Sequence, residues 1–365
     1  MALMALPSDF VRVLLLVSAV LLLQLSSAAV AFKGAYVAGT STGAHRENAA
    51  AEGTKPAQAA LNPRPLIGIL SQPGDPAPEG HSYIAASYVK FAEAGGARVV
   101  PLLVDDAEDV LRAKFEAING VIIPGGGADL SPGHPYREQT AKLLAWAIES
   151  NKRGDPFFMH GTCLGFQLLC VLQSKADMDI LSYFDSENLP SKLRFTDTAV
   201  TPSSGFLQSF SLELLNVLQN STVSFENHQN GVGVSDFFAD EELWKFFKVL
   251  ATSKDREGRD YVAMIEAFEY PVYATQFHPE KNAFEWVTTE DINHSAYGVM
   301  LMQSITNFLV SEARKSSHRP ASFEQEQEML IYNFKPEFTG KSIDKNSTHV
   351  ESNFDQAYFF PMKSL

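Results

Sequence analysis

Short apolar runs alternate with amphipathic stretches along the first half of the chain. The apolar runs predict strands at 66–70, 97–104, 120–123 and 156–159. Between them, apolar positions recur every three or four residues, which predicts helices over 81–94, up to about 117, and over 138–150. Strands that alternate with helices in this way form a mainly parallel sheet with both faces covered.

The second half of the chain is richer in alternating and β-branched segments. We expect an apolar helix over 164–172 and a closing helix over 295–315. The strands expected between these helices are 222–226, 246–252, 260–268 and 271–277. Because no linker rich in Pro, Gly or Ser divides 64–315, we predict one α/β domain there. Its mostly parallel central sheet is flanked by helices and followed by a β-rich second half.

Both ends of the chain differ from this domain. Residues 13–25 are almost entirely apolar and an Ala-x-Ala site follows at 29–31, so we interpret 1–31 as a signal peptide. An uncleaved anchor is the alternative, because the charged region before the apolar run is weak. Residues 32–63 have few large apolar side chains and are expected to be disordered or propeptide-like. The tail, 316–365, begins polar but contains several aromatic residues, so part of it is expected to pack on the domain.

Three glycosylation sequons occur, at Asn220, Asn293 and Asn346. Together with the signal peptide they predict a protein of the secretory pathway, destined for a vacuole, a lysosome or the outside of the cell. No second apolar run has spanning length, so we expect no membrane partner after signal cleavage.

The net charge of −14 limits the partners of the chain. Removing 1–31 removes one acid and one base, so the charge of the mature chain is unchanged. A nucleic-acid partner is excluded, because it would require a basic stripe. A polyanionic substrate would need a local basic cluster, for which the candidates are Arg98, Lys192, Arg194, Lys254 and Arg256, although each also fits a solvated surface charge. The histidines and the two cysteines form no metal signature, and we expect no cofactor.

The strongest chemical signal is the segment His160–Gln167, in which a lone cysteine lies at the centre of Gly-x-Cys-x-Gly. A strand, a sharp turn and a helix would raise the thiol of Cys163 above the end of the sheet, as an exposed nucleophile. The helix N-terminus beneath it favours the negatively charged thiolate. A small buried hydrophobe is the alternative for any cysteine, and we prefer it for Cys170.

A nucleophilic thiol needs a base and a site that holds the oxyanion. The strand predicted over 271–277 ends at His278, and Glu280 lies two residues further on, where it can orient the imidazole. Backbone N–H groups of Gly126 and Gly127, and of Leu164 after the nucleophile, are the expected oxyanion donors. Each of these motifs alone also fits an ordinary turn. Their order, each at the carboxyl end of a predicted strand, favours catalysis.

With these motifs the chain resembles the γ-glutamyl hydrolases of the class I glutamine amidotransferase-like superfamily. The resemblance rests on residues 64–70, 83–90, 95–101 and 124–126, the Cys163 segment and residues 276–281. It implies a small-molecule substrate, the γ-linked glutamate tail of folates and antifolates, and a homodimer. It also implies that His228 helps to bind substrate. Family members often carry glutamate where this chain has Gln167, whose neutral amide could bind a substrate carboxylate or position a neighbouring loop.

Two other functions fit the same motifs. The first is a glutaminase-type subunit that releases ammonia from glutamine with the same three residues, although such subunits are intracellular and this chain begins with a signal peptide. The second is a catalytically inactive secreted glycoprotein, which the intact set of cysteine, histidine and glutamate disfavours.

Overall fold

The computed structural model describes residues 61–196, 204–340 and 354–363. The predicted signal peptide, most of the segment 32–63 and the sequon at Asn346 lie outside the described residues. Within the described ranges, no helix combines the length and apolar character needed to cross a membrane.

The first half of the domain alternates strands and helices, as its apolar pattern predicts. Its elements in chain order are β1 (Leu66–Leu70), β2 (Gln72–Pro73), β3 (His81–Ala85), α2 (Ala86–Ala94), β4 (Arg98–Leu102), α3 (Glu108–Ala117), β5 (Gly120–Ile123), α4 (Pro135–Lys152), β6 (Phe158–Thr162) and α5 (Leu164–Gln173).

The second half contains longer antiparallel strands and short helices. Its elements are η2 (Asp177–Ile180), β7 (Leu181–Ser191), β8 (Arg194–Phe195), α7 (Gly205–Gln208), α8 (Leu212–Asn220), β9 (Ser224–Val232), α9 (Val234–Ala239), α10 (Glu241–Phe246), β10 (Phe247–Lys254), β11 (Asp260–Ala267), β12 (Val272–Thr275), α11 (Lys281–Phe284), α12 (Ala296–Ala313), α13 (Phe323–Met329), η3 (Ile331–Asn333), β13 (Glu337–Phe338) and β14 (Gln356–Pro361).

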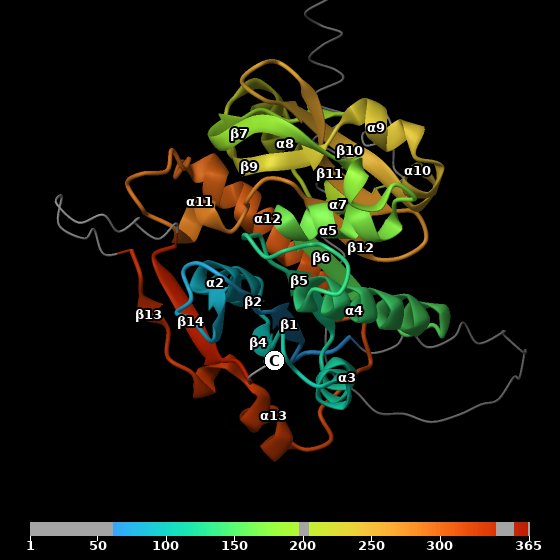
Figure 1. The fold of residues 1–365 in the computed structure, drawn as a ribbon, viewed down its shortest axis with the longest axis vertical. Coiled ribbons are helices and arrows are strands. Elements are labelled where there is room, and N and C mark those ends of the chain that lie inside the picture. The colour runs from blue at the N-terminus through green and yellow to red at the C-terminus, as the bar shows by residue number, and fades with distance from the viewer. Residues whose placement is uncertain (1–60, 197–203, 341–353, 364–365) are drawn as a thin grey trace, which may run out of the picture. The chain divides into compact units, whose positions relative to one another are not determined.

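An eight-stranded sheet runs through the described residues in the order β4-β1-β5-β6-β12-β11-β10-β8 (Figure 1). The strands from β4 to β12 are parallel to their neighbours, and those from β12 to β8 are antiparallel. The predicted α/β class, with a mostly parallel sheet, is therefore confirmed. Strands β12, β11, β10 and β8 of the β-rich second half extend this sheet at one edge.

Two smaller sheets were not anticipated. Strands β7 and β9 pair antiparallel, and a second small sheet has the order β13-β14-β3-β2. The helix predicted over 81–94 is wrong in its first part, because His81–Ala85 is strand β3. It pairs along its length with β14, from the end of the chain. A partner more than 270 residues away supplies hydrogen bonds that the local pattern could not predict.

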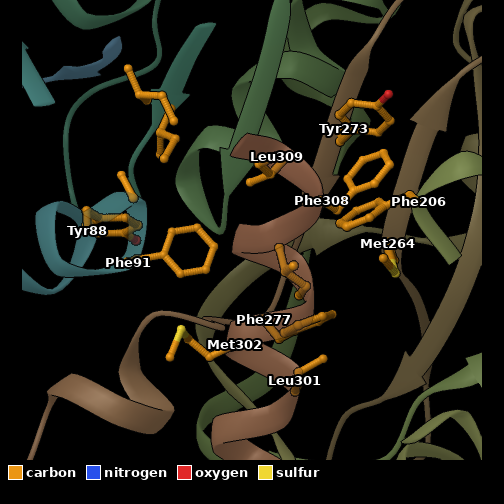
Figure 2. Close-up of a cluster of buried hydrophobic side chains, with 14 of the residues drawn as sticks. Tyr88, Phe91, Phe206, Met264, Tyr273, Phe277, Leu301, Met302, Phe308 and Leu309 are labelled. Atoms are coloured by element: carbon orange, nitrogen blue, oxygen red, sulfur yellow. The ribbon is translucent and has the colours of Figure 1, made fainter. Parts of the chain in front are cut away.

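Hydrophobic clusters cover both faces of the central sheet. On one face α2 and α12 pack against buried side chains that also include Phe206 and Tyr273. Figure 2 shows Phe308 of α12 beside Phe206 and Tyr273, with ring centroids 5.0 and 4.9 Å from its own, and Phe91 of α2 on the opposite side of α12. The second cluster, on the other face, includes buried side chains of α3, α4 and α5. Burial on both faces fixes the strand ends from which the candidate site is built.

Candidate active site

Three neighbouring strands deliver the predicted catalytic segments to one edge of the sheet. Strands β5, β6 and β12 are adjacent and parallel, and they lead into the glycine loop, the cysteine turn and the histidine segment respectively. The turn is tied directly to β12, since the backbone N–H of Cys163 donates to the carbonyl of Thr275 at 2.8 Å. Carboxyl ends of parallel strands are where open α/β sheets bind ligands.

The turn at Cys163 is sharp and strained. Cys163 has φ 51° and ψ −104°, a backbone conformation that residues other than glycine rarely adopt. Such a residue costs about 1–3 kcal/mol and persists only where its surroundings enforce it. Close packing of α5 on the sheet does so, because a Cβ on Gly165 would overlap the carbonyl of Ile123 and one on Gly161 would lie 2.6 Å from Gly165. The two glycines of Gly-x-Cys-x-Gly therefore permit the turn.

The thiol of Cys163 is not exposed, although the predicted strand, sharp turn and helix were expected to expose it. The residue is only 5% exposed because strand β9 crosses above it. Its Sγ atom lies 3.8 Å from the carbonyl oxygen of Asn227 in β9. The second cysteine, Cys170, is fully buried in the core, where burial raises the pKa of its thiol and disfavours the thiolate. The two cysteines are not bonded to each other.

His278 and Glu280 form a buried pair beside the thiol. The Nδ1 atom of His278 lies 2.7 Å from Oε1 of Glu280, and the two residues are 4% and 0% exposed. Burial disfavours the imidazolium, but the negative charges of Glu280 and Cys163 outweigh it and raise the pKa of His278 to about 10. Near neutral pH the imidazole is therefore protonated, with a carboxylate on one side and the sulfur on the other.

The glycine loop after β5 lies against this pair. A Cβ on Gly125 would stand 2.7 Å from Cε1 of His278 and 3.0 Å from Cβ of Cys163, so only glycine fits between them. Gly126, Gly127 and Leu164 line a cavity that also contains Cys163. Leu164 is the first residue of α5, so its N–H has no acceptor within the helix. The predicted oxyanion donors and the nucleophile thus border the same space.

The cavity beside Cys163 has a volume of about 410 Å³ and a polar wall. Gln167 lies on this wall, and its Nε2 donates to the carbonyl of Asn230 in β9 at 2.6 Å. Of the two uses expected for this amide, the structure shows the contact to a neighbouring segment. The cavity is also lined by Asn227, Gln229 and Asn230, whose side chains carry amide groups.

His228 lies in the same wall but turns its ring nitrogens inward. It is 4% exposed, and its Nε2 lies 3.3 Å from Oε2 of Glu226, which is fully buried. The ring also packs edge-on against Tyr261, with centroids 4.9 Å apart. Both nitrogens are buried away from solvent, and the side chain as a whole is only 1% exposed.

None of the basic residues considered for a polyanionic substrate lines this cavity. Arg98 pairs with Glu326, and Arg194 and Lys254 both pair with Asp260. Arg256 comes nearest, because its Nη2 donates to the carbonyl of Glu187, a cavity residue, at 2.6 Å. Glu187 itself is the acidic residue of the lining. The lining of the cavity therefore offers amide and backbone groups and includes no lysine or arginine.

The two described sequons lie apart from the site. Asn220 is exposed at the end of α8, where its amide donates to Asn216. Asn293 is half-buried, and its Nδ2 donates to the carbonyl of Thr222 at 2.9 Å. In the part of the chain that the structure describes, no group of three or more His, Cys, Asp or Glu side chains could hold a metal ion.

Sequence reasoning missed three residues that contact Cys163, Gln167 or the glycine loop. The carbonyls of Asn227 and Asn230 contact Cys163 and Gln167, but backbone acceptors carry no signal in the sequence. The hydroxyl of Tyr88 accepts the N–H of Gly125 at 2.8 Å. Tyr88 belongs to the segment 83–90 that carries the family resemblance, so the motif was visible although its contact was not.

Known proteins are similar to this chain over most of its length. The family model described as "Glutamine amidotransferase class-I" matches residues 80–286, which include all three catalytic candidates. The chain is 41% identical to "Gamma-glutamyl hydrolase 1" of Arabidopsis thaliana, over 82% of this chain and 84% of the relative. It is 40% identical to "Gamma-glutamyl hydrolase" of Mus musculus, over 81% of this chain and 90% of the relative. With "Gamma-glutamyl hydrolase B" of Dictyostelium discoideum the identity is 35%, over 82% and 84% of the two chains.

Proposed function

Because the chain belongs to the class I glutamine amidotransferase family and, within it, to the γ-glutamyl hydrolases, we propose that it hydrolyses γ-glutamyl bonds through a cysteine thioester. The observation that carries the proposal is the convergence of Cys163, His278 and Glu280 on the glycine loop. A carboxylate, an imidazole and a thiol in this order constitute an activated nucleophile.

The proposed reaction follows from these positions. The thiolate of Cys163 attacks the γ-carbonyl carbon, and the carbonyl oxygen becomes an oxyanion held by the N–H groups of Gly126 or Gly127 and of Leu164. The C–N bond then breaks as the imidazolium of His278 gives its proton to the leaving amine. Water, deprotonated by His278, attacks the thioester and releases the γ-carboxylate and the thiol. Glu280 holds the imidazole in orientation throughout.

For the substrate we propose folylpoly-γ-glutamates and antifolate polyglutamates, on the strength of the family resemblance. The polar wall supports a glutamyl group, which offers a carbonyl, an amide and an α-carboxylate to Gln167 and to the β9 residues. His228, whose imidazole lies against the carboxylate of Glu226, belongs to the same wall. No step of this chemistry needs a cofactor, since the nucleophile, proton carrier and oxyanion donors are all groups of the chain.

The decisive experiment measures two products from two substrates. We expect glutamate release from a pteroylpoly-γ-glutamate and no ammonia release from glutamine, and we expect Cys163→Ala to lose the glutamate release. Ammonia release from glutamine with intact polyglutamate would indicate the glutaminase alternative. No turnover of either substrate by the folded wild-type protein would indicate the inactive glycoprotein.

We also propose that the chain enters the secretory pathway, with 1–31 as signal peptide, 64–315 as catalytic domain and a homodimer as the assembled form. Glycan is expected at Asn220, whose side chain is exposed, more than at Asn293, whose amide is engaged. N-terminal sequencing should begin near Phe32 or later, and sedimentation should give the mass of a dimer. Asn220→Gln should reduce the glycosidase-sensitive mobility shift; an unshifted wild-type protein with an intact Met1 would contradict the assignment.

A further inference from the structure

The hydroxyl of Tyr88 lies among the catalytic groups although the mechanism above does not use it. Tyr88 is in the first turn of α2 and only 1% exposed. Its Oη atom accepts the N–H of Gly125 at 2.8 Å. The position that a Cβ on Gly125 would take is 3.0 Å from this oxygen and 2.7 Å from Cε1 of His278. The phenol therefore shares one small space with the nucleophile and its base.

The hydrogen atom of this hydroxyl needs an acceptor. The Gly125 N–H occupies a lone pair of Oη, and a phenol still has one proton to donate. Glu280 has a buried carboxylate oxygen to receive it. Its Oε1 contacts His278, whereas its Oε2 is buried without any hydrogen bond among the described residues. Burial first, and the negative charge of Glu280 second, raise the pKa of Tyr88, so the phenol keeps its proton.

The peptide between Pro124 and Gly125 is held from two sides. Tyr136, also 1% exposed, donates from its hydroxyl to the carbonyl of Pro124 at 2.7 Å. Tyr88 accepts from the N–H of the same peptide. The two tyrosines thus fix one peptide plane, which sets the direction of the glycine residues that follow. They differ toward Glu280, whose negative charge contributes to the raised pKa of Tyr88, whereas the pKa of Tyr136 is raised by burial first and by Tyr83 and Cys163.

We propose that Tyr88 is a positioning residue that links the glycine loop to the catalytic carboxylate by accepting from Gly125 and donating to Glu280. The inference rests on the proposed cysteine mechanism and adds a group that couples its two halves. Through Tyr88, the loop that carries the oxyanion donors and the pair that carries the proton keep a fixed relative position.

Tyr88→Phe tests the link, with Tyr136→Phe as the matched control. Both variants remove a buried phenol hydroxyl from the same peptide. We expect Tyr88→Phe to lower kcat by about 10- to 100-fold with KM within about threefold, less than the loss of a direct oxyanion donor. Tyr136→Phe should lower kcat by less than about tenfold. Equal losses in the two variants would overturn the proposal in favour of loop packing alone.

Alkylation of Cys163 by iodoacetamide separates this proposal from the proposed function, because it needs no γ-glutamyl substrate. A hydrogen bond to Glu280 favours the charged carboxylate, which in turn favours the protonated imidazole of His278 beside a reactive thiolate. Without this hydrogen bond, the decline of the alkylation rate at acid pH (its acid limb) should begin at higher pH in Tyr88→Phe, by about half a unit or more. Tyr136→Phe should leave this limb in place. An unmoved limb in Tyr88→Phe overturns the link even if hydrolysis is robust, whereas a moved limb supports it even if the substrate assignment fails.

A second substitution keeps the test independent of the folding of Tyr88→Phe. With 3-fluorotyrosine at position 88 the hydroxyl is retained and is a stronger donor, so the limb should move to lower pH. In a Glu280→Gln background neither change at position 88 should move the limb further. A shift of equal size in that background would show that the hydroxyl acts without Glu280 and would overturn the proposal.

Discussion

Gly125→Ala is the sharpest test of how the candidate site is packed. The added Cβ would lie 2.7 Å from Cε1 of His278, 3.0 Å from Cβ of Cys163 and 3.0 Å from Oη of Tyr88. Carbon atoms pack at about 3.5–4.0 Å, so the imidazole must move by about 1 Å to accommodate the methyl group. A displacement of that size between reacting groups costs about 100-fold in rate, which corresponds to about 2.7 kcal/mol.

The assay compares kcat for γ-glutamyl hydrolysis with the free energy of unfolding in urea. We expect kcat to fall by about 100-fold and the fold to lose about 1–3 kcal/mol through overpacking. Gly127→Ala is the control from the same loop, because a Cβ there meets no atom within 4 Å. Its kcat should stay within about tenfold of the wild type, since the backbone N–H is retained. A folded Gly125→Ala protein with kcat within threefold of wild type would show that the base is not held against this glycine.

Cys163→Ala should abolish turnover by several orders of magnitude, whereas Cys170→Ala should stay active and lose about 1–2 kcal/mol of stability in urea, as expected for a small cavity; appreciable hydrolysis by Cys163→Ala would exclude the thioester. Because the pKa of His278 is raised to about 10, its imidazolium stabilises the folded state. This contribution is fully present below the unfolded pKa of ~6.5 and is lost as pH rises through 10. Unfolding midpoints from pH 6 to 10 should therefore fall, and in Cys163→Ala the fall should begin at lower pH because one negative charge beside the imidazole is gone. His228→Ala should mainly raise KM, by a factor that corresponds to ~1–3 kcal/mol of lost binding free energy, because Glu226 is left buried without its imidazole. A loss in kcat at unchanged KM would instead place His228 in the chemical step. Gln167→Glu sets a carboxylate against the carbonyl of Asn230, so KM should rise although the nucleophile is intact; an unchanged KM would show that this contact does not shape the cavity.

Elements that carry a clear apolar pattern of their own were predictable, and those whose conformation depends on pairing with another strand were not. The all-apolar runs of β1 and β5 are buried on both faces, and the sequence pattern marks them within a residue or two. Strand β3 was predicted as helix, because its apolar spacing suits either conformation and the choice depends on β14. Strand β7 has no clear alternation and forms only against β9, across two irregularities in its register.

The same distinction applies to the candidate site. Cys163, His278 and Glu280 were identifiable because a side chain with intrinsic chemistry follows a recognisable strand. The burial of Cys163 was not, because it depends on a strand that crosses from a different sheet. The inward orientation of His228 depends on the placement of Glu226 within the fold, which spacing along the chain does not give.

The pairing of β3 with β14 has a consequence for synthesis. In the small sheet β14 lies between β13 and β3, so β3 has β2 as its partner on one side and waits for β14 on the other. A ribosome makes β3 and α2 long before it makes Gln356–Pro361. Helix α2, which carries Tyr88, follows β3 without a break. The nascent chain therefore holds its cysteine, histidine and glutamate before the small sheet can close, so hydrolytic competence should arise only once β14 has left the ribosome and paired with β3.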